Sequence, residues 1–461
     1  LLLRWPPDYP ELRHLIIDEV HELAEKADGA YAQTVEAVEI IHRIESVTKR
    51  NGGKKGDHTA ELDEPASRAL ALVSAVGAEA RMIAGSDDPE PQGWRDELAL
   101  PMDGPGPAWK ELLDAALELA GVLDGLGRRL AKTAESDNSP EAGAADQLLE
   151  AARVLEESFP YPSADLVVRL RGLARRNPKA WRLIATPVSP AADFQLNVLD
   201  RVETFFGTSA TLGIGEDIRG SVGALEFEER SAGRFKLEES IESPFDFENN
   251  LQVLLLSDAT EPARLVEKTT RAIATVAERL GGRTMGLFTS RDRLAAVANN
   301  LDPILARHGI SIIAPSMGNA DPHGLVRSFM ESENSVLLGA RAFWQGVDVP
   351  GPACQALIIE KLPFDVPSDP LLQRRGELIA AEGGHAFSDY TMPRMLLRLK
   401  QMVGRLIRTP TDRGMVVVVE PRSDRRYFKR LFEALPSGAR TRVLPLSDLA
   451  EAVEELTNSQ L

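Results

Sequence analysis

An acidic pair follows an apolar run near the start of the chain. Asp18 and Glu19 come directly after "HLII", and the segment "VHELAEKA" that follows has helical spacing. Magnesium binds one or two carboxylates together with phosphate oxygens and water, and a second carboxylate can activate the attacking water. An aspartate that caps a helix, with a glutamate in the first turn, is an equally ordinary arrangement. The pair alone leaves both interpretations open.

Two arginines and a glutamine stand together much later, in "RMLLRLKQMVGRLIR". At about 100° per residue, Gln401, Arg405 and Arg408 fall on one face of a helix and the apolar residues on the other. The guanidinium fork matches phosphate oxygens, and an arginine that reaches across from a second domain stabilises phosphoryl transfer. A solvated basic face is the structural alternative.

Hydroxyl residues follow two apolar runs. "GTSATLG" offers Ser209 and Thr211 among small residues that allow a close backbone approach, and "LFTS" ends in Thr289 and Ser290 at a predicted helix start. Hydroxyls together with N-terminal helix amides can bind a phosphate. A plain turn and an ordinary N-cap are the alternatives for these two segments.

Two further segments combine aromatic and charged residues. "LLGARAFWQGVDVPG" places Phe343 and Trp344 near Asp348, either to stack on a base or to fill the core. Residues 167–182 interleave arginines with Trp181, either to contact a nucleic-acid backbone or to balance acidic residues elsewhere. We favour charge balance for this second segment.

The elements that must position these residues alternate between strand and helix. The apolar runs "LQVLLL", "TMGLFT", "SIIA", "SVLLG", "QALIIE" and "MVVVVE" alternate with helical patterns at 261–280, 291–308, 321–331 and 393–408. This rhythm predicts an α/β fold with a parallel sheet, in which ligands bind at the carboxyl ends of the strands. Residues 12–17 are expected to form a buried strand, and "VETFFGTSATLG" a strand that ends in small and hydroxyl residues.

The segment from 30 to 165 has a different composition. It contains 26 acidic and 13 basic residues and therefore carries −13 of the net charge of −17. Its Ala- and Leu-rich stretches have helical spacing, so we predict an all-helical insertion. The acidity thus belongs to one segment and does not exclude a nucleic-acid partner.

Composition limits the remaining classes of protein. The single cysteine, Cys354, excludes disulfides and a cysteine-rich metal site within this chain. No apolar run approaches the roughly 18 residues that cross a bilayer, so we expect no membrane partner and a cytoplasmic protein, associated with the nucleoid if bacterial.

In their sequence order the motifs "IIDEVHE", "GTSATLG", "ESPF", "LFTS", "LLGARAFWQGVDVPG" and "QMVGRLIR" resemble the DinG/XPD-type superfamily 2 DNA helicases, and the DinG branch in particular. The resemblance covers residues 12–30 and 195–430. It implies two RecA-like domains, the first incomplete at 1–29 and 183–240 and the second at 241–461, with an arch-like insertion and return segment at 30–182. ATP would bind between the domains, and single-stranded or forked DNA across them. We expect a monomer, and no protein partner is assigned.

The resemblance also implies a role for each motif residue. Asp18 would hold Mg²⁺ through water and Glu19 would activate the attacking water. Ser209, Ala210 and Thr211 would couple nucleotide state to DNA grip. In the second domain, the residues expected to contact the nucleotide are Gly346, Asp348 and Gln401. The arginines expected to reach the γ-phosphate are Arg405 and Arg408. The residues expected to contact nucleic acid are Thr289, Ser290 and Arg341.

One departure from the family is serious. The chain contains no G-K-S or G-K-T, although the family places a phosphate-binding loop before the "DEVH" motif. The family's iron–sulfur cluster uses four cysteines, so Cys354 alone cannot hold it in this chain. We therefore expect the carboxyl-terminal part of a longer helicase, which hydrolyses ATP poorly by itself. An ATPase-deficient nucleic-acid-binding module and a nuclease-associated DinG member are the alternatives.

Overall fold

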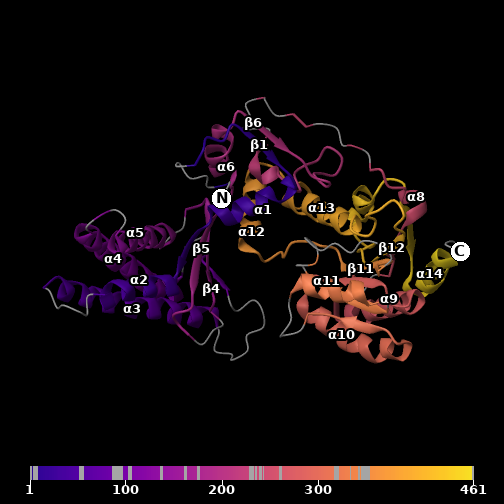
Figure 1. Ribbon diagram of the computed structural model, residues 1–461, viewed down its shortest axis with the longest axis horizontal. Helices are drawn as coiled ribbons and strands as arrows, with labels where there is room; N and C mark the ends of the chain where they lie inside the picture. The colour runs from indigo at the N-terminus through magenta and orange to yellow at the C-terminus, as the bar shows by residue number, and fades with distance from the viewer. Residues whose placement is uncertain are drawn as a thin grey trace.

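The computed structural model (Figure 1) describes the chain apart from residues 1–2, 4–8, 51–56, 86–96, 102–105, 135, 137–138, 160–162, 174–176, 228–232, 234–235, 238–240, 242, 259–261, 316–320, 333, 341–342, 344–352 and 459–461. The described residues form three sheets, of two, four and seven strands. Each sheet has its own hydrophobic core, and together with their helices they account for the α/β fold that the sequence predicts.

The seven-stranded sheet is parallel throughout. Its order is β13-β7-β12-β11-β8-β10-β9, and its strands are β7 (Leu251–Leu256), β8 (Thr284–Leu287), β9 (Ser311–Ile313), β10 (Ser335–Gly339), β11 (Ala356–Lys361), β12 (Gly414–Glu420) and β13 (Arg440–Leu444). Every residue of β7, β10 and β12 is buried. This is expected of parallel strands with both faces covered, and it explains why these runs are apolar without alternation.

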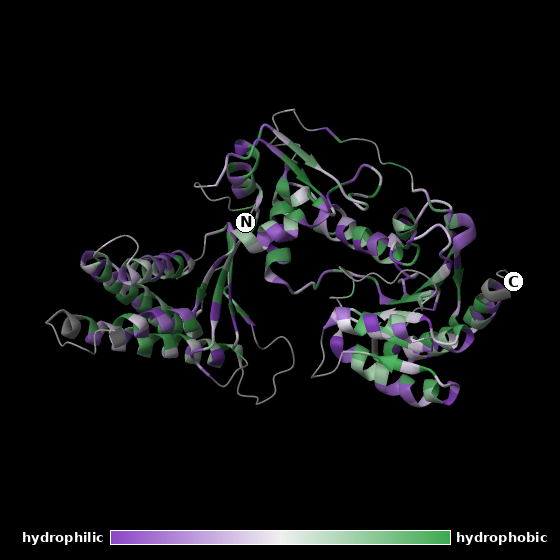
Figure 2. Ribbon diagram, viewed as in Figure 1, coloured by the Kyte–Doolittle hydropathy of each residue, from purple (hydrophilic) through white to green (hydrophobic). Residues whose placement is uncertain are grey.

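Helices cover both faces of this sheet. Leu254 and Val417 pack with α9 (Leu265–Leu280), α10 (Arg291–Leu305) and α14 (Leu449–Asn458). Val253 and Val418 point to the other face, against α11 (Pro322–Glu331), α13 (Met392–Val403) and the 3₁₀ helix η13 (Arg426–Ala434). The strands and the inward helix faces are green in Figure 2, which shows the two apolar layers on either side of the sheet.

The first sheet has two parallel strands among the described residues. β1 (His14–Ile17) pairs with β6 (Thr204–Gly207), and α1 (Leu23–Tyr31) and α6 (Ala191–Asn197) belong to the same part of the molecule. The expectation that the strand at residues 12–17 is buried is wrong. Ile16 is 74% exposed and its register partner Phe206 is 57% exposed, because one face of this pair is open in the described structure.

The insertion contains the helices that the sequence predicts: α2 (Ala37–Arg50), α3 (Asp57–Ala84), α4 (Lys110–Thr133) and α5 (Pro140–Ser158). The prediction that it is all-helical needs correction. A four-stranded antiparallel sheet of order β2-β5-β4-β3 joins these helices: β2 (Gln33–Glu36), β3 (Glu97–Ala99), β4 (Leu166–Arg171) and β5 (Arg182–Pro187). In β4, Val168 and Leu170 enter the core whereas Arg171 points outward. The segment that the sequence analysis described as a basic cluster therefore has the alternation of a strand.

The remaining elements are short, apart from α12 (Pro370–Ala381), which contacts the insertion sheet at β4. A π-helical turn, η12 (Phe387–Thr391), leads into α13. The others are α8 (Phe247–Asn250) and the 3₁₀ turns η5 (Pro107–Trp109), η6 (Leu199–Arg201), η7 (Gly223–Leu225), η8 (Pro262–Arg264), η9 (Ala306–His308) and η14 (Leu446–Asp448). The domain limits at 29/30, 182/183 and 240/241 stay predictions, and β5 begins at the second of these points.

Candidate active site and nucleic-acid interface

The acidic pair lies at the carboxyl end of β1. Asp18 and Glu19 are both exposed, and Glu19 adopts a left-handed backbone conformation with φ 53° and ψ 41°. This conformation costs a residue with a Cβ about 1–2 kcal/mol, and such strain gathers at functional sites. The backbone bonds Thr208 N to Ile17 O, 2.9 Å, and Val20 N to Thr208 O, 3.0 Å, hold the turn in place.

The capping interpretation of this pair is wrong. Neither the 3₁₀ turn η2 (Val20–Glu22) nor α1 has a side-chain cap, and Asp18 Oδ1 instead accepts from the adjacent Glu19 N at 2.9 Å. The carboxylates are therefore not used to satisfy helix amides beyond this single bond. They are exposed at the end of a parallel strand, where ligands of such sheets bind.

Ser209 connects this pair to the loop after β6. Its Oγ donates to Glu19 Oε2 at 3.2 Å, lies 2.7 Å from His21 Nδ1, and accepts from Thr211 N at 3.1 Å. His21 Nδ1 also lies 3.1 Å from Glu19 Oε2. These contacts hold the loop through Ala210 next to the acidic pair. The two segments are neighbours because they follow the paired strands β6 and β1.

Helix α13 approaches the same loop from the second domain. Gln401 Nε2 donates to Thr211 Oγ1 at 3.1 Å, and Lys400 Nζ donates to Gly213 O at 3.0 Å. Burial lowers the pKa of Lys400. A continuous hydrogen-bonded path therefore runs from Glu19 through Ser209 and Thr211 to Gln401, and the structure brings these predicted site residues together.

The predicted helical face needs correction at Arg405 and Arg408. Helix α13 ends at Val403, so both arginines lie in the segment beyond the helix. The amides of Arg408 and Thr409 donate to the buried Asp412 Oδ2 at 2.9 and 2.8 Å, so a side chain competes with the helical pattern there. Arg405 is half-buried and Arg408 is exposed, and they follow the Gln401 end of the helix in a loop that Asp412 fixes.

Ser290 and Thr289 lie at the carboxyl end of β8. Ser290 is the N-cap of α10, where its Oγ accepts a hydrogen bond from Arg293 N at 3.4 Å. The N-cap interpretation therefore describes this contact of Ser290. Thr289 donates to Glu360 Oε2 through both its N and its Oγ1, each at 3.3 Å. The sequence analysis missed Glu360 and Arg293, which form an ion pair beneath this site. A carboxylate that ends the apolar run "LIIE" was the available signal.

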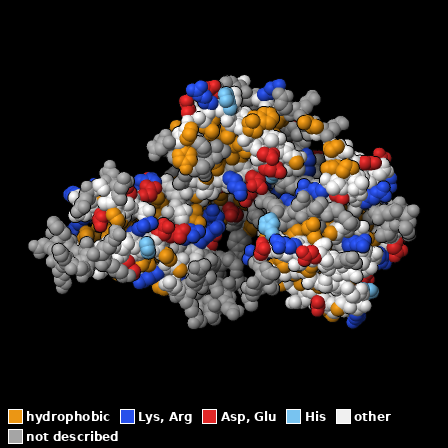
Figure 3. Space-filling model, viewed as in Figure 1, with side chains coloured by type: hydrophobic (Ala, Val, Ile, Leu, Met, Phe, Trp, Pro, Cys, Tyr) orange, Lys and Arg blue, Asp and Glu red, His pale blue; other side chains and the backbone are white. Residues whose placement is uncertain are grey.

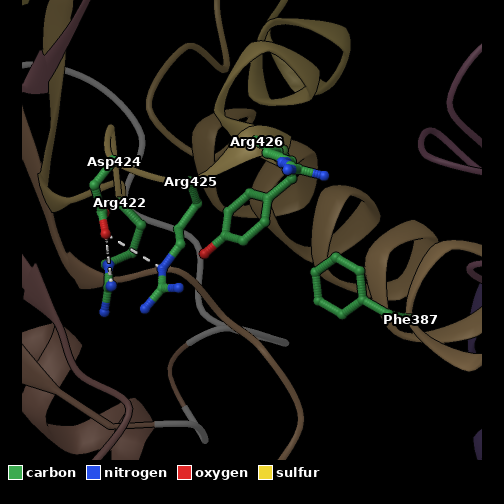
Figure 4. Close-up of a pocket in the computed structure, with 6 residues that line it drawn as sticks. Phe387, Arg422, Asp424, Arg425 and Arg426 are labelled. Carbon is green, nitrogen blue, oxygen red and sulfur yellow. Dashed lines mark hydrogen bonds and ion pairs between the residues drawn. The ribbon is translucent and has the colours of Figure 1, made fainter.

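A hollow of about 650 Å³ lies beyond the end of β12 (Figure 4). Arg422 has a left-handed backbone with φ 58°, and its Nε and Nη2 donate to the two carboxylate oxygens of Asp424 at 3.0 and 2.9 Å. Arg425 Nε lies 3.3 Å from Asp424 Oδ2 and its side chain is 56% exposed. The left-handed turn thus presents guanidinium groups at one side of the hollow.

Two aromatic rings, of Phe387 and Tyr427, also line this hollow. The rings of Phe387 and Tyr427 are 5.7 Å apart between centroids, and Phe364 packs on both at 6.0 and 5.6 Å. Burial raises the pKa of Tyr427. Exposed aromatic edges beside guanidinium groups are the combination that accepts a base and its phosphate. No motif pointed to this site, although "PRSDRRYFKR" combines both residue types.

The basic cluster at 167–182 balances acidic residues of the insertion, as we favoured. Arg169 and Arg171 lie 3.5 and 2.7 Å from the carboxylate of Glu97, and Arg182 lies 2.7 Å from that of Glu36. Trp181 is buried and its Nε1 donates to a backbone carbonyl at 2.8 Å. Acidic and basic side chains also alternate across the face shown in Figure 3.

Several predicted residues lie outside the described part of the chain: Arg341, Trp344, Gly346 and Asp348. Phe343, which is described, is buried in the second-domain core, so the core interpretation is confirmed for this ring. Within the described ranges, no group of three or more His, Cys, Asp and Glu side chains gathers as a metal site. In the same ranges, no helix has the length and apolar content to cross a bilayer.

Comparisons with known proteins agree with this arrangement. Residues 273–438 match the helicase C-terminal domain. The ATP-dependent DNA helicase YoaA of Escherichia coli is 31% identical over 281 residues, which is 60% of this chain and 41% of that protein. Over these residues the chain is similar to helicases of the DinG and YoaA type.

Two other similar proteins carry the DinG name. The ATP-dependent helicase DinG of Mycobacterium tuberculosis is 31% identical over 291 residues, 62% of this chain and 42% of that protein. The 3'-5' exonuclease DinG of Bacillus subtilis is 28% identical over 316 residues, 67% of this chain and 32% of that protein. The chain thus spans between 32% and 42% of the length of these relatives.

A solved structure extends the likeness to the whole fold. An XPD helicase matches 94% of this chain and 68% of its own with a TM-score of 0.50 and 13% identity. At this identity the match supports the fold alone, and it includes the insertion between the two parts of the first domain.

Proposed function

We propose that this chain forms part of the motor of an ATP-dependent DNA helicase of the DinG/XPD type. The observation that carries the proposal is the hydrogen-bonded path from Glu19 through Ser209 and Thr211 to Gln401. It joins the exposed carboxylates of one parallel sheet to a helix packed on another. Two domains connected in this way can respond together to a change at the acidic pair.

The residues at this path fit one side of a magnesium–ATP site. Asp18 and Glu19 are exposed oxygen donors of the type that hydrated Mg²⁺ prefers, and Glu19 is held at a strained turn that orients its carboxylate. ATP, when bound, supplies the phosphoanhydride bond whose hydrolysis drives movement. In this proposal Asp18 holds the magnesium through water, and Glu19 orients the attacking water and accepts its proton.

The second domain contributes positive charge and hydrogen-bond donors. Arg405 and Arg408 follow Gln401, and their guanidinium groups would neutralise charge on the γ-phosphate. We also retain Gly346 and Asp348 as nucleotide-side residues, and Ser209, Ala210 and Thr211 as the coupling loop. Because Gln401 already contacts Thr211, a change of nucleotide state would be felt in this loop.

The sequence lacks the phosphate-binding loop that would hold the nucleotide opposite the second domain. No G-K-S or G-K-T occurs among its 461 residues, so no phosphate-cradling loop of that kind is available within them. We propose that this chain alone hydrolyses ATP poorly. An iron–sulfur cluster likewise needs more thiolates than Cys354, whose burial raises its thiol pKa to about 12.

The proposed DNA path follows the carboxyl edge of the seven-stranded sheet. Thr289 and Ser290 follow the carboxyl end of β8, and the hollow formed by Phe387, Arg425 and Tyr427 lies beyond β12. Hydroxyls and guanidinium groups suit phosphates, and the rings suit unpaired bases. Arg341 stays a proposed contact. We propose a single-stranded or forked DNA substrate, 5′→3′ movement, a monomer, and a cytoplasmic protein.

The test uses the product of the complete open reading frame that encodes these residues. We expect ATP turnover that depends on single-stranded DNA, and unwinding of a forked duplex with a 5′ tail but not with a 3′ tail. ATP turnover without unwinding of either fork would contradict the helicase proposal. Unwinding from the 3′ tail would overturn only the polarity.

The DNA path has its own variant. Arg425→Ala should weaken single-stranded DNA binding. The slope of log binding constant against log salt concentration should become shallower by about one, because one fewer phosphate is neutralised. Arg442→Ala on the edge strand β13 is the matched control, since Arg442 pairs with Glu455 away from the hollow. Equal DNA affinity and equal salt dependence for wild type and Arg425→Ala would remove the hollow from the path.

A further inference from the structure

Arg375 joins the second domain to the two first-domain segments that flank the insertion, at Asp28 and Val188. It lies on α12 and is buried, with a side chain only 7% exposed. Its Nε donates to Val188 O at 2.7 Å, just after β5 returns from the insertion. Its Nη1 donates to Asp28 Oδ2 at 2.9 Å, just before the chain enters the insertion, and Nη2 bonds the other oxygen of the same carboxylate.

Other contacts fasten the same helix to the insertion sheet. Leu371 packs with Val167 and Val188 in a separate small core. Arg374 Nε donates to Ala164 O at 3.1 Å, and Asp369 lies 3.6 Å from Arg169 of β4. The first turns of α12 therefore contact the insertion at β4, and Figure 1 shows this helix near β4 and β5.

The helix is also connected to the nucleotide side of the molecule. Arg375 Nη1 donates to Tyr390 OH at 3.1 Å, and Tyr390 belongs to the π-helical turn that leads into α13. Arg219 of the first domain donates to Asp389 of that turn at 3.1 Å. A π-helical turn often marks a functional position in a helix. A shift of α13, which carries Gln401, would thus be passed through this turn to Arg375.

We propose that Arg375 is a positioning residue that makes the insertion move with the second domain when α13 moves. The Arg375 guanidinium holds Asp28 and Val188, which flank the insertion within the first domain. The contacts of the same helix with Ala164 and Arg169 hold the insertion itself, so α12 and the insertion behave as one body. This inference rests on the proposed function for its link to ATP, whereas the physical connection is a property of this chain by itself.

The first experiment measures the connection in this chain without nucleotide. Spin labels on cysteines introduced at Met82 of the insertion, which is 66% exposed, and at Asn299 of α10, which is exposed, report the distance between the two bodies. Cys354 is buried and stays unlabelled. We expect one narrow distance in the wild type and a broad distribution in Arg375→Gln. An unchanged distribution in Arg375→Gln would overturn the proposal.

Controls separate positioning from folding. Arg271→Gln removes an exposed arginine of α9 and should leave the distance narrow. Asp28→Asn keeps the arginine but weakens the fork, and Arg375→Lys keeps the charge but loses the fork geometry, so both should broaden the distribution less. If Arg375→Gln fails to fold, a narrow distance in folded Asp28→Asn and Arg375→Lys would count against the proposal.

The second experiment uses the complete reading-frame product. Arg375→Gln should keep its DNA-stimulated ATP turnover while the base pairs unwound per ATP fall at least about tenfold. An equal loss of turnover and unwinding would contradict a positioning role. Absence of turnover in the wild type would instead contradict the proposed function, and the distance measurement would still decide the connection.

Discussion

The two parallel sheets of this molecule differ in how the strand ends that carry the candidate site are held in place. The seven-stranded sheet buries every residue of β7, β10 and β12 between two helical layers, and Gln401 rests on one of these layers. The two-stranded sheet leaves Ile16 and Phe206 exposed, and its acidic turn is fixed by hydrogen bonds from the neighbouring loop. The second-domain side of the site is therefore fixed by a core, and the first-domain side by a few polar contacts.

This difference has a consequence for the site as a whole. In the proposed reaction the exposed carboxylates would act on the weakly supported side, and the arginines after α13 would supply positive charge on the well-supported side. Either side alone would leave the proposed reaction incomplete. Removing an arginine from the rigid side should therefore abolish turnover without disturbing the fold.

Arg405→Ala gives the largest expected effect. In the complete product, DNA-stimulated turnover should fall by about 10³-fold or more, while single-stranded DNA affinity is nearly kept, because the guanidinium would act on transition-state charge. Steady-state ATP hydrolysis and a fluorescence binding assay measure the two quantities. Arg413→Ala, an exposed arginine of the same region, is the matched control. Undiminished hydrolysis in Arg405→Ala would remove this residue from the reaction.

Truncating one apolar residue in each sheet sharpens the comparison. Leu254→Ala in the buried sheet should lower the free energy of unfolding by about 2–5 kcal/mol, since it opens a cavity in a closed core. Ile16→Ala should change it by no more than about 0.5 kcal/mol, because the side chain is already exposed. Urea unfolding of this chain checks both. A large loss for Ile16→Ala would mean that its face is covered in solution.

Acid should lower the free energy of unfolding of the domain with the seven-stranded sheet, through protonation of Asp365. Burial by itself would raise the pKa of this carboxyl, but the charges and hydrogen bonds of Arg394 and Arg398 lower it below its ordinary value. The folded state therefore gains stability above about pH 4 and loses it as the pH falls through the lowered pKa. Asp365→Asn should cost about 2 kcal/mol near neutral pH and flatten this acid dependence. Urea midpoints across acid pH test this, and an equally steep acid loss in the variant would exclude Asp365 as the cause.

The hydrogen bond between the two sides gives the smallest expected effect. Thr211→Val and Gln401→Ala should each reduce turnover, and a double-mutant cycle should yield a coupling of about 0.5–1.5 kcal/mol for this single neutral bond. The matched cycle of Thr211→Val with Arg413→Ala should yield additivity. Additivity between Thr211 and Gln401 as well would mean that their contact does not transmit the nucleotide state.

The buried strands were predictable from sequence, and their surroundings were not. Runs such as "LQVLLL" and "MVVVVE" are apolar at every position, so parallel strands followed directly. The insertion sheet was missed because Arg169 and Arg171 alternate with apolar residues over a short strand and looked like a basic patch. The exposure of Ile16 could not be read from its type, since exposure depends on what covers a strand.

The site residues show the same division. The order of the acidic pair, the hydroxyl loop and the Gln401 helix was visible in the sequence, and the structure brings them together. The helical face that included Arg405 and Arg408 failed, because Asp412 takes the amides that an extended helix would need. Arg375 was not visible as a connection, since its partners Asp28 and Val188 lie far away in the chain.

The most direct test of the account is ATP turnover by Glu19→Gln in the complete reading-frame product, with saturating single-stranded DNA. The account predicts a loss of at least about 100-fold in turnover with DNA affinity retained, because the amide can neither accept the proton of the attacking water nor hold the same charge. Turnover within about twofold of the wild type would contradict the assignment of the acidic pair as the catalytic centre.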